Sequence, residues 1–129
     1  MTSSKAAQTI LIADDFQEYA ALLANTLKAE GFLTVTVNDG ASAIEKARAV
    51  KPDLILLDIM MPNIAGTEVR AELMKEAATK DIPMVFLTGL RAPHTTKKPF
   101  IDGVKVIGKS KTFDEILSTV REILGKPVR

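Results

Sequence analysis

The stretch DLILLDIMMP, residues 53–62, places four consecutive apolar residues directly before Asp58, and a turn ending in Pro62 follows. A short, continuous apolar run is typical of a strand that is buried on both faces of a sheet. In open α/β sheets, ligands bind outside the carboxyl ends of the strands. We therefore interpret Asp58 as a charged group at the end of a central strand, where a functional site would lie.

Strand-like and helix-like segments alternate along the rest of the chain. Apolar residues recur at helical spacing after Phe16, and further helices are expected after Asp39, Gly66 and Thr112. Asp39 is a predicted N-cap, and Thr112 with Glu115 forms a capping-box pattern. Such alternation indicates a parallel sheet covered by helices on both faces. The five strand candidates are residues 9–13, 33–37, 54–57, 84–87 and 104–107.

The strand sequences also predict their positions in the sheet. Residues 9–13, 54–57 and 84–87 are continuously apolar, as central strands should be, whereas polar residues interrupt the other two strands. With 33–37 and 104–107 at the edges, right-handed connections give the strand order 2-1-3-4-5. The expected fold is a flavodoxin-like, doubly wound α/β domain with a five-stranded parallel sheet.

One segment, residues 91–103, fits this fold poorly. It should contain the fourth helix, but Pro93 and Pro99 flank only a short polar stretch. A proline inside a helix removes a hydrogen bond and clashes with the preceding turn, at a cost of about 3 kcal/mol or more. We expect the fourth helix to be short or irregular, and His94 to be an exposed loop residue.

The composition limits the classes of function. The 129 residues include 17 basic and 16 acidic side chains and no cysteine. A balanced, unclustered charge favours neither a nucleic-acid nor an anionic-membrane surface, and no disulfide or thiolate metal site can form. No apolar run reaches the roughly 20 residues that span a membrane. We expect a soluble, cytoplasmic protein with a flexible N-terminus at residues 1–8, one domain at 9–125 and a tail at 126–129.

Charged and polar side chains follow four of the predicted strands. Asp14 and Asp15 follow the first strand and Asp58 the third, while Thr88 follows the fourth and Lys109 the fifth. Three carboxylates at one edge repel each other, and a hard cation such as Mg2+ relieves that repulsion through oxygen ligands. This set of groups suits phosphoryl transfer, in which a protein mainly positions groups and neutralises charge.

Within such a site, Asp58 would attack phosphorus and form an aspartyl phosphate. Asp15 and Asp58 would hold Mg2+ directly, and Asp14 would act largely through water. The main-chain carbonyl of Met60 would complete the metal shell. The hydroxyl after the fourth strand and the ammonium after the fifth would bind the remaining phosphoryl oxygens.

Four motifs stand in order at successive strand ends: DD at 14–15, LLDIMMPNIAG at 56–66, LTG at 87–89 and GK at 108–109. In these motifs, and over nearly its whole length, the chain resembles the receiver domain of two-component response regulators. The resemblance implies that a histidine kinase or histidine phosphotransfer protein phosphorylates Asp58 with Mg2+, or with Mn2+ as an alternative ion. It also implies that partner binding at the fifth strand and its flanking helices then changes.

Two positions depart from the family's pattern. Members usually have proline after the lysine, commonly with a cis bond before it, whereas this chain has Ser110. We expect a trans bond there and an altered loop path. Three residues before the lysine, many members carry an aromatic switch residue, but this chain has Val106. A valine cannot make the same rotation, so the usual coupling to Thr88 is not expected.

Other interpretations of these residues remain open. Asp15 with Glu18 also fits a helix-capping pair, and the chain fits a degenerate receiver that acts as a phosphorylation-independent interaction module. A metal-dependent phosphohydrolase of the haloacid dehalogenase type is less favoured, because Met60 occupies the place of its second aspartate. We expect a phosphoacceptor and not a turnover enzyme, acting alone, as a phosphate shuttle, or as a piece of a larger protein with an unidentified downstream protein partner.

Overall fold

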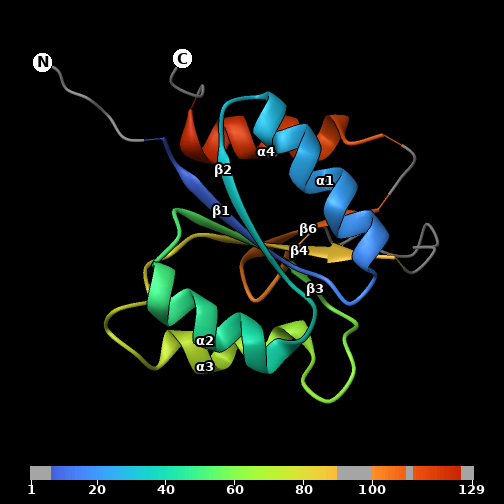
Figure 1. Ribbon diagram of the computed structural model, residues 1–129. Coiled ribbons are helices and arrows are strands. Elements are labelled where there is room, and N and C mark those ends of the chain that lie inside the picture. The colour runs from blue at the N-terminus through green and yellow to red at the C-terminus, as the bar shows by residue number, and fades with distance from the viewer. Residues whose placement is uncertain (1–6, 90–99, 110–111, 126–129) are drawn as a thin grey trace, which may run out of the picture.

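The computed structural model describes residues 7–89, 100–109 and 112–125. Figure 1 shows a twisted sheet with α1 and α4 on one face and α2 and α3 on the other. In chain order the elements are β1 (Thr9–Ala13), α1 (Gln17–Ala29), β2 (Leu33–Val37), α2 (Gly40–Val50), β3 (Leu54–Asp58), α3 (Gly66–Met74), β4 (Met84–Thr88), β5 (Phe100–Ile101), β6 (Val104–Gly108) and α4 (Asp114–Leu124).

The sheet order is β2-β1-β3-β4-β6-β5. The five longer strands pair in parallel, and β6 is the fifth predicted strand, so the predicted order 2-1-3-4-5 is confirmed. The prediction that residues 104–107 form an edge is wrong, because β5 pairs antiparallel with β6 on its outer side. Asp102 and Gly103 between these strands have φ of 50° and 80°. Positive φ at both positions is what a two-residue type I′ hairpin turn requires, and Asp-Gly is its usual sequence.

The central strands alternate between two apolar cores. Ile10, Ile12 and Leu56 pack with α1 and α4, while Leu11 and Leu57 face the core that α2 and α3 cover. Every residue of β3 is buried, as the continuous apolar run predicted. The carboxyl end of β3 is therefore buried in the middle of the sheet.

The helix ends follow the sequence signals in part. The Asp39 carboxylate accepts a hydrogen bond from the Ser42 N–H at 2.7 Å, which confirms the predicted cap of α2. Helix α4 begins one residue later than Thr112 would place it: its N-cap is Phe113, which forms no side-chain cap hydrogen bond. Within the described residues, no helix is long and apolar enough to cross a membrane.

The predicted short or irregular fourth helix lies mostly outside the described residues. Residues 91–99 of the proline-flanked segment are not described, and neither are His94 and Ser110. The last residues of that segment, 100–103, form β5 and the hairpin turn. These residues add a short strand to the sheet next to β6.

Candidate functional site

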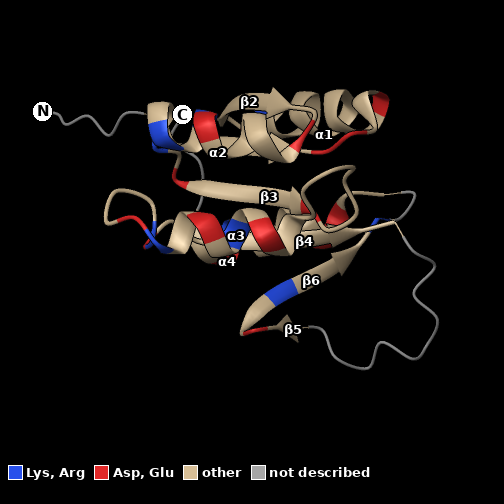
Figure 2. Cartoon of the chain, turned by 90° about the horizontal axis from the view of Figure 1, so that it is seen from below, with Lys and Arg blue, Asp and Glu red and all other residues tan. Residues whose placement is uncertain are grey.

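Three carboxylates meet at the carboxyl ends of β1 and β3. These strands are neighbours, with Ala13 opposite Leu57, so Asp14, Asp15 and Asp58 arrive at one edge. One carboxylate oxygen from each of the three lies within 4.8 Å of the others. Asp14 and Asp58 are buried, and Asp15 is exposed. Figure 2 shows acidic positions on the side of the sheet toward which β3 points. The structure thus brings these three residues together at one edge of the sheet, as the sequence predicted.

Lys109 reaches the two buried carboxylates from the end of β6. Its Nζ lies 2.6 Å from Asp14 Oδ2 and 3.4 Å from Asp58 Oδ2. The Lys109 N–H also donates to the Thr88 carbonyl at 2.8 Å, which fixes the backbone beside β4. The contact with Asp14 is an ion pair and not a well-aligned hydrogen bond, since Asp14 Oδ2 has no hydrogen-bond partner in the described part of the chain. The ammonium offsets part of the repulsion between the carboxylates.

The loop after β3 packs closely around Asp58. The Met60 N–H donates to Asp58 Oδ1 at 3.2 Å, and the Gly66 N–H donates to the Ile59 carbonyl at 2.9 Å. A Cβ atom at Gly66 would lie 2.4 Å from the Asp58 carbonyl oxygen, so only glycine fits this approach. The Met60 side chain is exposed. The loop therefore places the Asp58 carboxylate and the main chain of Met60 beside each other.

The electrostatic environment of Asp58 favours its neutral form. Burial and, next in size, the Asp14 carboxylate raise the pKa of Asp58 to about 7. The Lys109 ammonium and the Met60 N–H act in the opposite direction and favour the carboxylate. Near neutral pH and without a metal, Asp58 is therefore partly protonated. A cation that binds there competes with this proton.

Thr88 and Val106 occupy the neighbouring strands. Thr88 is the last residue of β4, is buried, and lies opposite Gly108 of β6. Its carbonyl accepts the hydrogen bond from the Lys109 N–H, and the residue before it, Leu87, lies opposite Asp58 at the end of β3. Val106 lies opposite Phe86 and packs, partly buried, against the core that α2 and α3 cover. Thr88 therefore belongs to the edge that carries the carboxylates, and Val106 lies two residues further back along β6.

Tyr19 also lies at the site, and the sequence pattern alone places it only among the apolar residues at helical spacing after Phe16. Its ring centroid lies 4.8 Å from Lys109 Nζ, and its ring makes a T-shaped contact with Phe113. The sequence signal was weak: Tyr19 is the single tyrosine of the chain and lies four residues after Asp15. Its contact with Lys109 joins residues that are 90 positions apart, and a local sequence pattern carries no information on such a contact.

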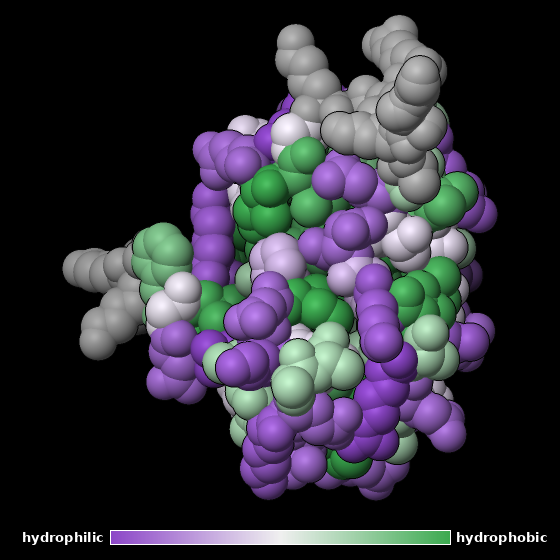
Figure 3. Space-filling view, turned by 90° about the vertical axis from the view of Figure 1, so that its left-hand side faces the viewer, coloured by the Kyte–Doolittle hydropathy of each residue, from purple (hydrophilic) through white to green (hydrophobic). Residues whose placement is uncertain are grey.

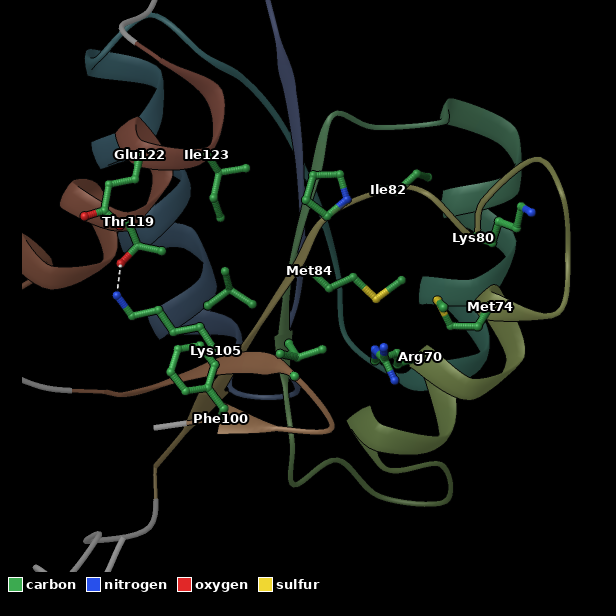
Figure 4. Close-up of a pocket in the computed structure, with 14 residues that line it drawn as sticks. Arg70, Met74, Lys80, Ile82, Met84, Phe100, Lys105, Thr119, Glu122 and Ile123 are labelled. Atoms are coloured by element: carbon green, nitrogen blue, oxygen red, sulfur yellow. Dashed lines mark hydrogen bonds between the residues drawn. The ribbon is translucent and has the colours of Figure 1, made fainter. Parts of the chain in front are cut away.

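A cavity of about 530 Å³ lies at the opposite end of the sheet. Figure 4 shows Met84 and Phe100 at its wall with Arg70, Lys80 and Lys105 around it, and Lys105 donates to the Thr119 hydroxyl at 3.1 Å. Met84 and Val104 are the first residues of β4 and β6, so this cavity lies away from the carboxylates. The face of the molecule in Figure 3 shows small apolar areas broken by hydrophilic side chains. The carboxylate edge remains the candidate site.

Comparison with known proteins agrees with this fold and site. Over residues 10–121 the chain matches the family model of the response regulator receiver domain, and it therefore belongs to that family. Receiver domains of response regulators are signalling proteins and not conventional enzymes.

Several curated relatives come from mycobacteria, and two of them illustrate the match. TcrX of Mycobacterium tuberculosis, named as a probable transcriptional regulatory protein, is 36% identical over 119 residues, which are 92% of this chain and 50% of TcrX. The DNA-binding response regulator MtrA of Mycolicibacterium smegmatis is 38% identical over 81 residues, which are 63% of this chain and 34% of MtrA. The matches span between about a third and a half of these longer proteins.

Among solved structures, the response regulator TrrA of Thermotoga maritima in complex with Mg2+ and BeF is similar to this chain. The two share 31% sequence identity with a TM-score of 0.76, over 91% of this chain and 99% of TrrA. TrrA is also known in complex with the histidine kinase ThkA, and that structure matches with a TM-score of 0.74 over 91% of this chain and 98% of TrrA.

Proposed function

We propose that this domain is a phosphorylation-dependent signalling switch in which Asp58 accepts a phosphoryl group from a phosphohistidine. The observation that carries the proposal is a buried carboxylate at the end of the central strand, 3.4 Å from the Lys109 ammonium and beside two further carboxylates. A histidine kinase or a histidine phosphotransfer protein would supply the phosphoryl group. The known complex of TrrA with a histidine kinase supports a donor of this class.

The three carboxylates fit a divalent cation. One carboxylate oxygen from each residue lies within 4.8 Å of the other two, and Asp14 Oδ2, which pairs with the Lys109 ammonium at 2.6 Å, accepts no aligned hydrogen bond among the described residues. Mg2+ prefers such oxygen ligands, and Mn2+ accepts them as well. We assign Asp15, Asp58 and the Met60 carbonyl to the metal, with Asp14 acting through water. When bound, the cation neutralises charge on the phosphoryl oxygens.

The transfer itself needs an ionised, accessible Asp58 oxygen. That oxygen forms a new P–O bond as the P–N bond of the phosphohistidine breaks, and the imidazole leaves with the electron pair and takes up a proton. Lys109 favours the ionised form of Asp58 before attack. Lys109 and the Thr88 hydroxyl would then bind phosphoryl oxygens, which stabilises the charge that develops in the transition state.

The output of the switch would be altered binding of a protein partner near β6 and its flanking helices. Val106 occupies the place of the usual aromatic switch, and its partly buried side chain packs within the sheet's own core. The signal would therefore leave the site by another route. A phosphorylation-independent interaction module is the alternative function, and the first experiment below separates the two.

Intact mass measurement tests the proposal directly. After incubation with Mg2+ and acetyl phosphate, the wild-type protein is expected to gain one phosphoryl group, and Asp58→Asn is expected to gain none. Asp81→Asn, which changes an exposed carboxylate outside the site, should be phosphorylated like the wild type. An unmodified wild type would favour the interaction module, and a phosphoryl group on Asp58→Asn would refute the assigned acceptor.

A further inference from the structure

The Lys109 ammonium has an aromatic neighbour in addition to its two carboxylates. Nζ lies over the Tyr19 ring, 4.8 Å from the centroid, which is within the range of a cation–π interaction. The Lys109 side chain is only 14% exposed, so water screens this attraction poorly. The ring of Tyr19 therefore contributes to the position of the ammonium beside Asp14 and Asp58.

The same ring contacts the beginning of α4. The Tyr19 and Phe113 rings have centroids 5.5 Å apart and planes at 77°, a favourable T-shaped arrangement. Phe113 is the N-cap of α4, and its carbonyl accepts a hydrogen bond from the Leu117 N–H at 2.8 Å. Helices α1 and α4 cover the same face of the sheet in Figure 1. Tyr19 thus lies between the acidic site and the first turn of α4.

The hydroxyl of Tyr19 does not explain its position. The hydroxyl oxygen is buried and has no hydrogen-bond partner among the described residues. Burial, followed by the charges of Asp14 and Asp58, raises the pKa of Tyr19 to about 12, so the hydroxyl stays neutral. A neutral hydroxyl without a partner cannot fix the ammonium. The ring is the part of this side chain that contacts both Lys109 and Phe113.

We propose that Tyr19 is a positioning residue whose ring holds the Lys109 ammonium at the carboxylates and links it through Phe113 to α4. The inference rests on the proposed phosphorylation of Asp58. An aspartyl phosphate would offer Lys109 new oxygens, and the ammonium would then shift relative to the Tyr19 ring. Because Tyr19 and Phe113 pack directly, the shift would reach the first turn of α4. This ring pair would replace the aromatic switch that is absent at Val106.

The contact can be tested without metal or phosphoryl donor. NMR should show the side-chain ε-protons of Lys109 shifted upfield by the ring current of residue 19 in the wild type and in Tyr19→Phe. In Tyr19→Leu, which keeps an apolar side chain, these protons should return to their usual position. Wild-type protons without an upfield shift would overturn the proposal. A loss of the shift in Tyr19→Phe would also overturn it, because the hydroxyl would then be the group that acts.

The functional part uses two readouts on the intact chain. With Mg2+ and acetyl phosphate, Tyr19→Leu should be phosphorylated about fivefold more slowly than the wild type, whereas Tyr19→Phe should restore the rate. Amide exchange across α4 should change on addition of beryllofluoride in the wild type and Tyr19→Phe. The same change should be absent or at least halved in Tyr19→Leu and in Phe113→Leu. Leu22→Ala, on the exposed side of α1, is the matched control and should behave as wild type.

The outcomes separate this inference from the proposed function. If the wild type takes up no phosphoryl group, the proposed function fails, and the NMR measurement still decides the contact. If Tyr19→Leu and Phe113→Leu are phosphorylated at the wild-type rate and α4 responds fully, the positioning role is refuted while the acceptor site stands. If Tyr19→Leu does not fold, Phe113→Leu tests the link to α4, and Tyr19→Phe against wild type tests the hydroxyl.

Discussion

At the scale of single residues, Asp58 serves two opposing requirements. It must be ionised to attack phosphorus, yet it lies buried beside Asp14, and both features raise its pKa to about 7. Lys109 reduces this conflict but does not remove it, because one ammonium faces two buried carboxylates. A site of this kind is expected to reduce the stability of the metal-free protein.

Asp58→Asn should therefore stabilise the metal-free protein. A folded-state pKa of about 7, above the ordinary 3.8, means that the folded state binds more protons between these values. The free energy of unfolding of the wild type should fall as pH rises through that window. At pH 8 the variant should be more stable, by on the order of 2 kcal/mol after allowance for solvent screening, and the gap should close toward pH 4.

Urea denaturation between pH 4 and 8 measures this difference. The exposed carboxylate of Asp81 supplies the control, since Asp81→Asn should change the free energy of unfolding by less than about 0.5 kcal/mol at any pH in this range. A stability gap between Asp58→Asn and wild type that widens in acid would contradict the assigned pKa direction of Asp58.

At the scale of elements, the loop from β3 to α3 explains why the predicted site forms. Gly66 begins α3 and lies against the Asp58 carbonyl, while Glu68 accepts a hydrogen bond from the Ala65 N–H at 3.0 Å. The helix start and the acceptor strand are thus packed together. A change in one of them is expected to displace the other.

Gly66→Ala tests this packing. Its Cβ would lie 2.4 Å from the Asp58 carbonyl oxygen, so the loop would have to move, and we expect a loss of about 2 kcal/mol or more in stability. Gly108→Ala is the matched control: apart from its own chain neighbours, no atom of residues 7–89, 100–109 or 112–125 lies within 4 Å of its added Cβ, and its stability should stay within about 0.5 kcal/mol of wild type. Thermal unfolding of both variants measures this difference. Equal melting temperatures for Gly66→Ala and Gly108→Ala would contradict the tight packing of this loop.

The elements also show how far sequence reasoning reaches. Apolar runs predicted the central strands, and the residues after them predicted the carboxylate edge, because parallel strands share one direction. Strand β5 was missed because two residues are too few for a periodic pattern, although Asp102 and Gly103 signalled the hairpin. The neighbours of Lys109 were predicted only in part, since its contact with Tyr19 depends on how α1 rotates over the sheet.

At the scale of the whole molecule, the two ends of the sheet are chemically distinct. The carboxyl ends carry the acidic site, while the cavity at the amino ends of β4 and β6 is lined mainly by apolar and basic side chains, with Glu122 as its one acidic residue within the described part of the chain. Strands β4 and β6 run between them and pair along three residues, Phe86 to Thr88 with Val106 to Gly108. A cation bound at the acidic end would stabilise the whole domain, because it binds the folded state only and its ligands lie at the ends of β1 and β3, which pair in the middle of the sheet.

Mg2+ should accordingly raise the melting temperature of the wild-type protein, and more at pH 8 than at pH 6. The ion and the proton compete at Asp58, whose pKa is about 7, so binding is weaker where the residue is protonated. Ligand at 100 times its dissociation constant adds about 2.7 kcal/mol of stability, and EDTA should reverse the gain. Asp15→Asn removes one exposed oxygen ligand without disturbing the core and should lose most of the Mg2+ effect. If Mg2+ raised the melting temperature of Asp15→Asn as much as that of the wild type, or raised that of the wild type more at pH 6 than at pH 8, the ion would bind elsewhere. Only ligation by these carboxylates makes the gain in melting temperature depend on both Asp15 and the proton on Asp58.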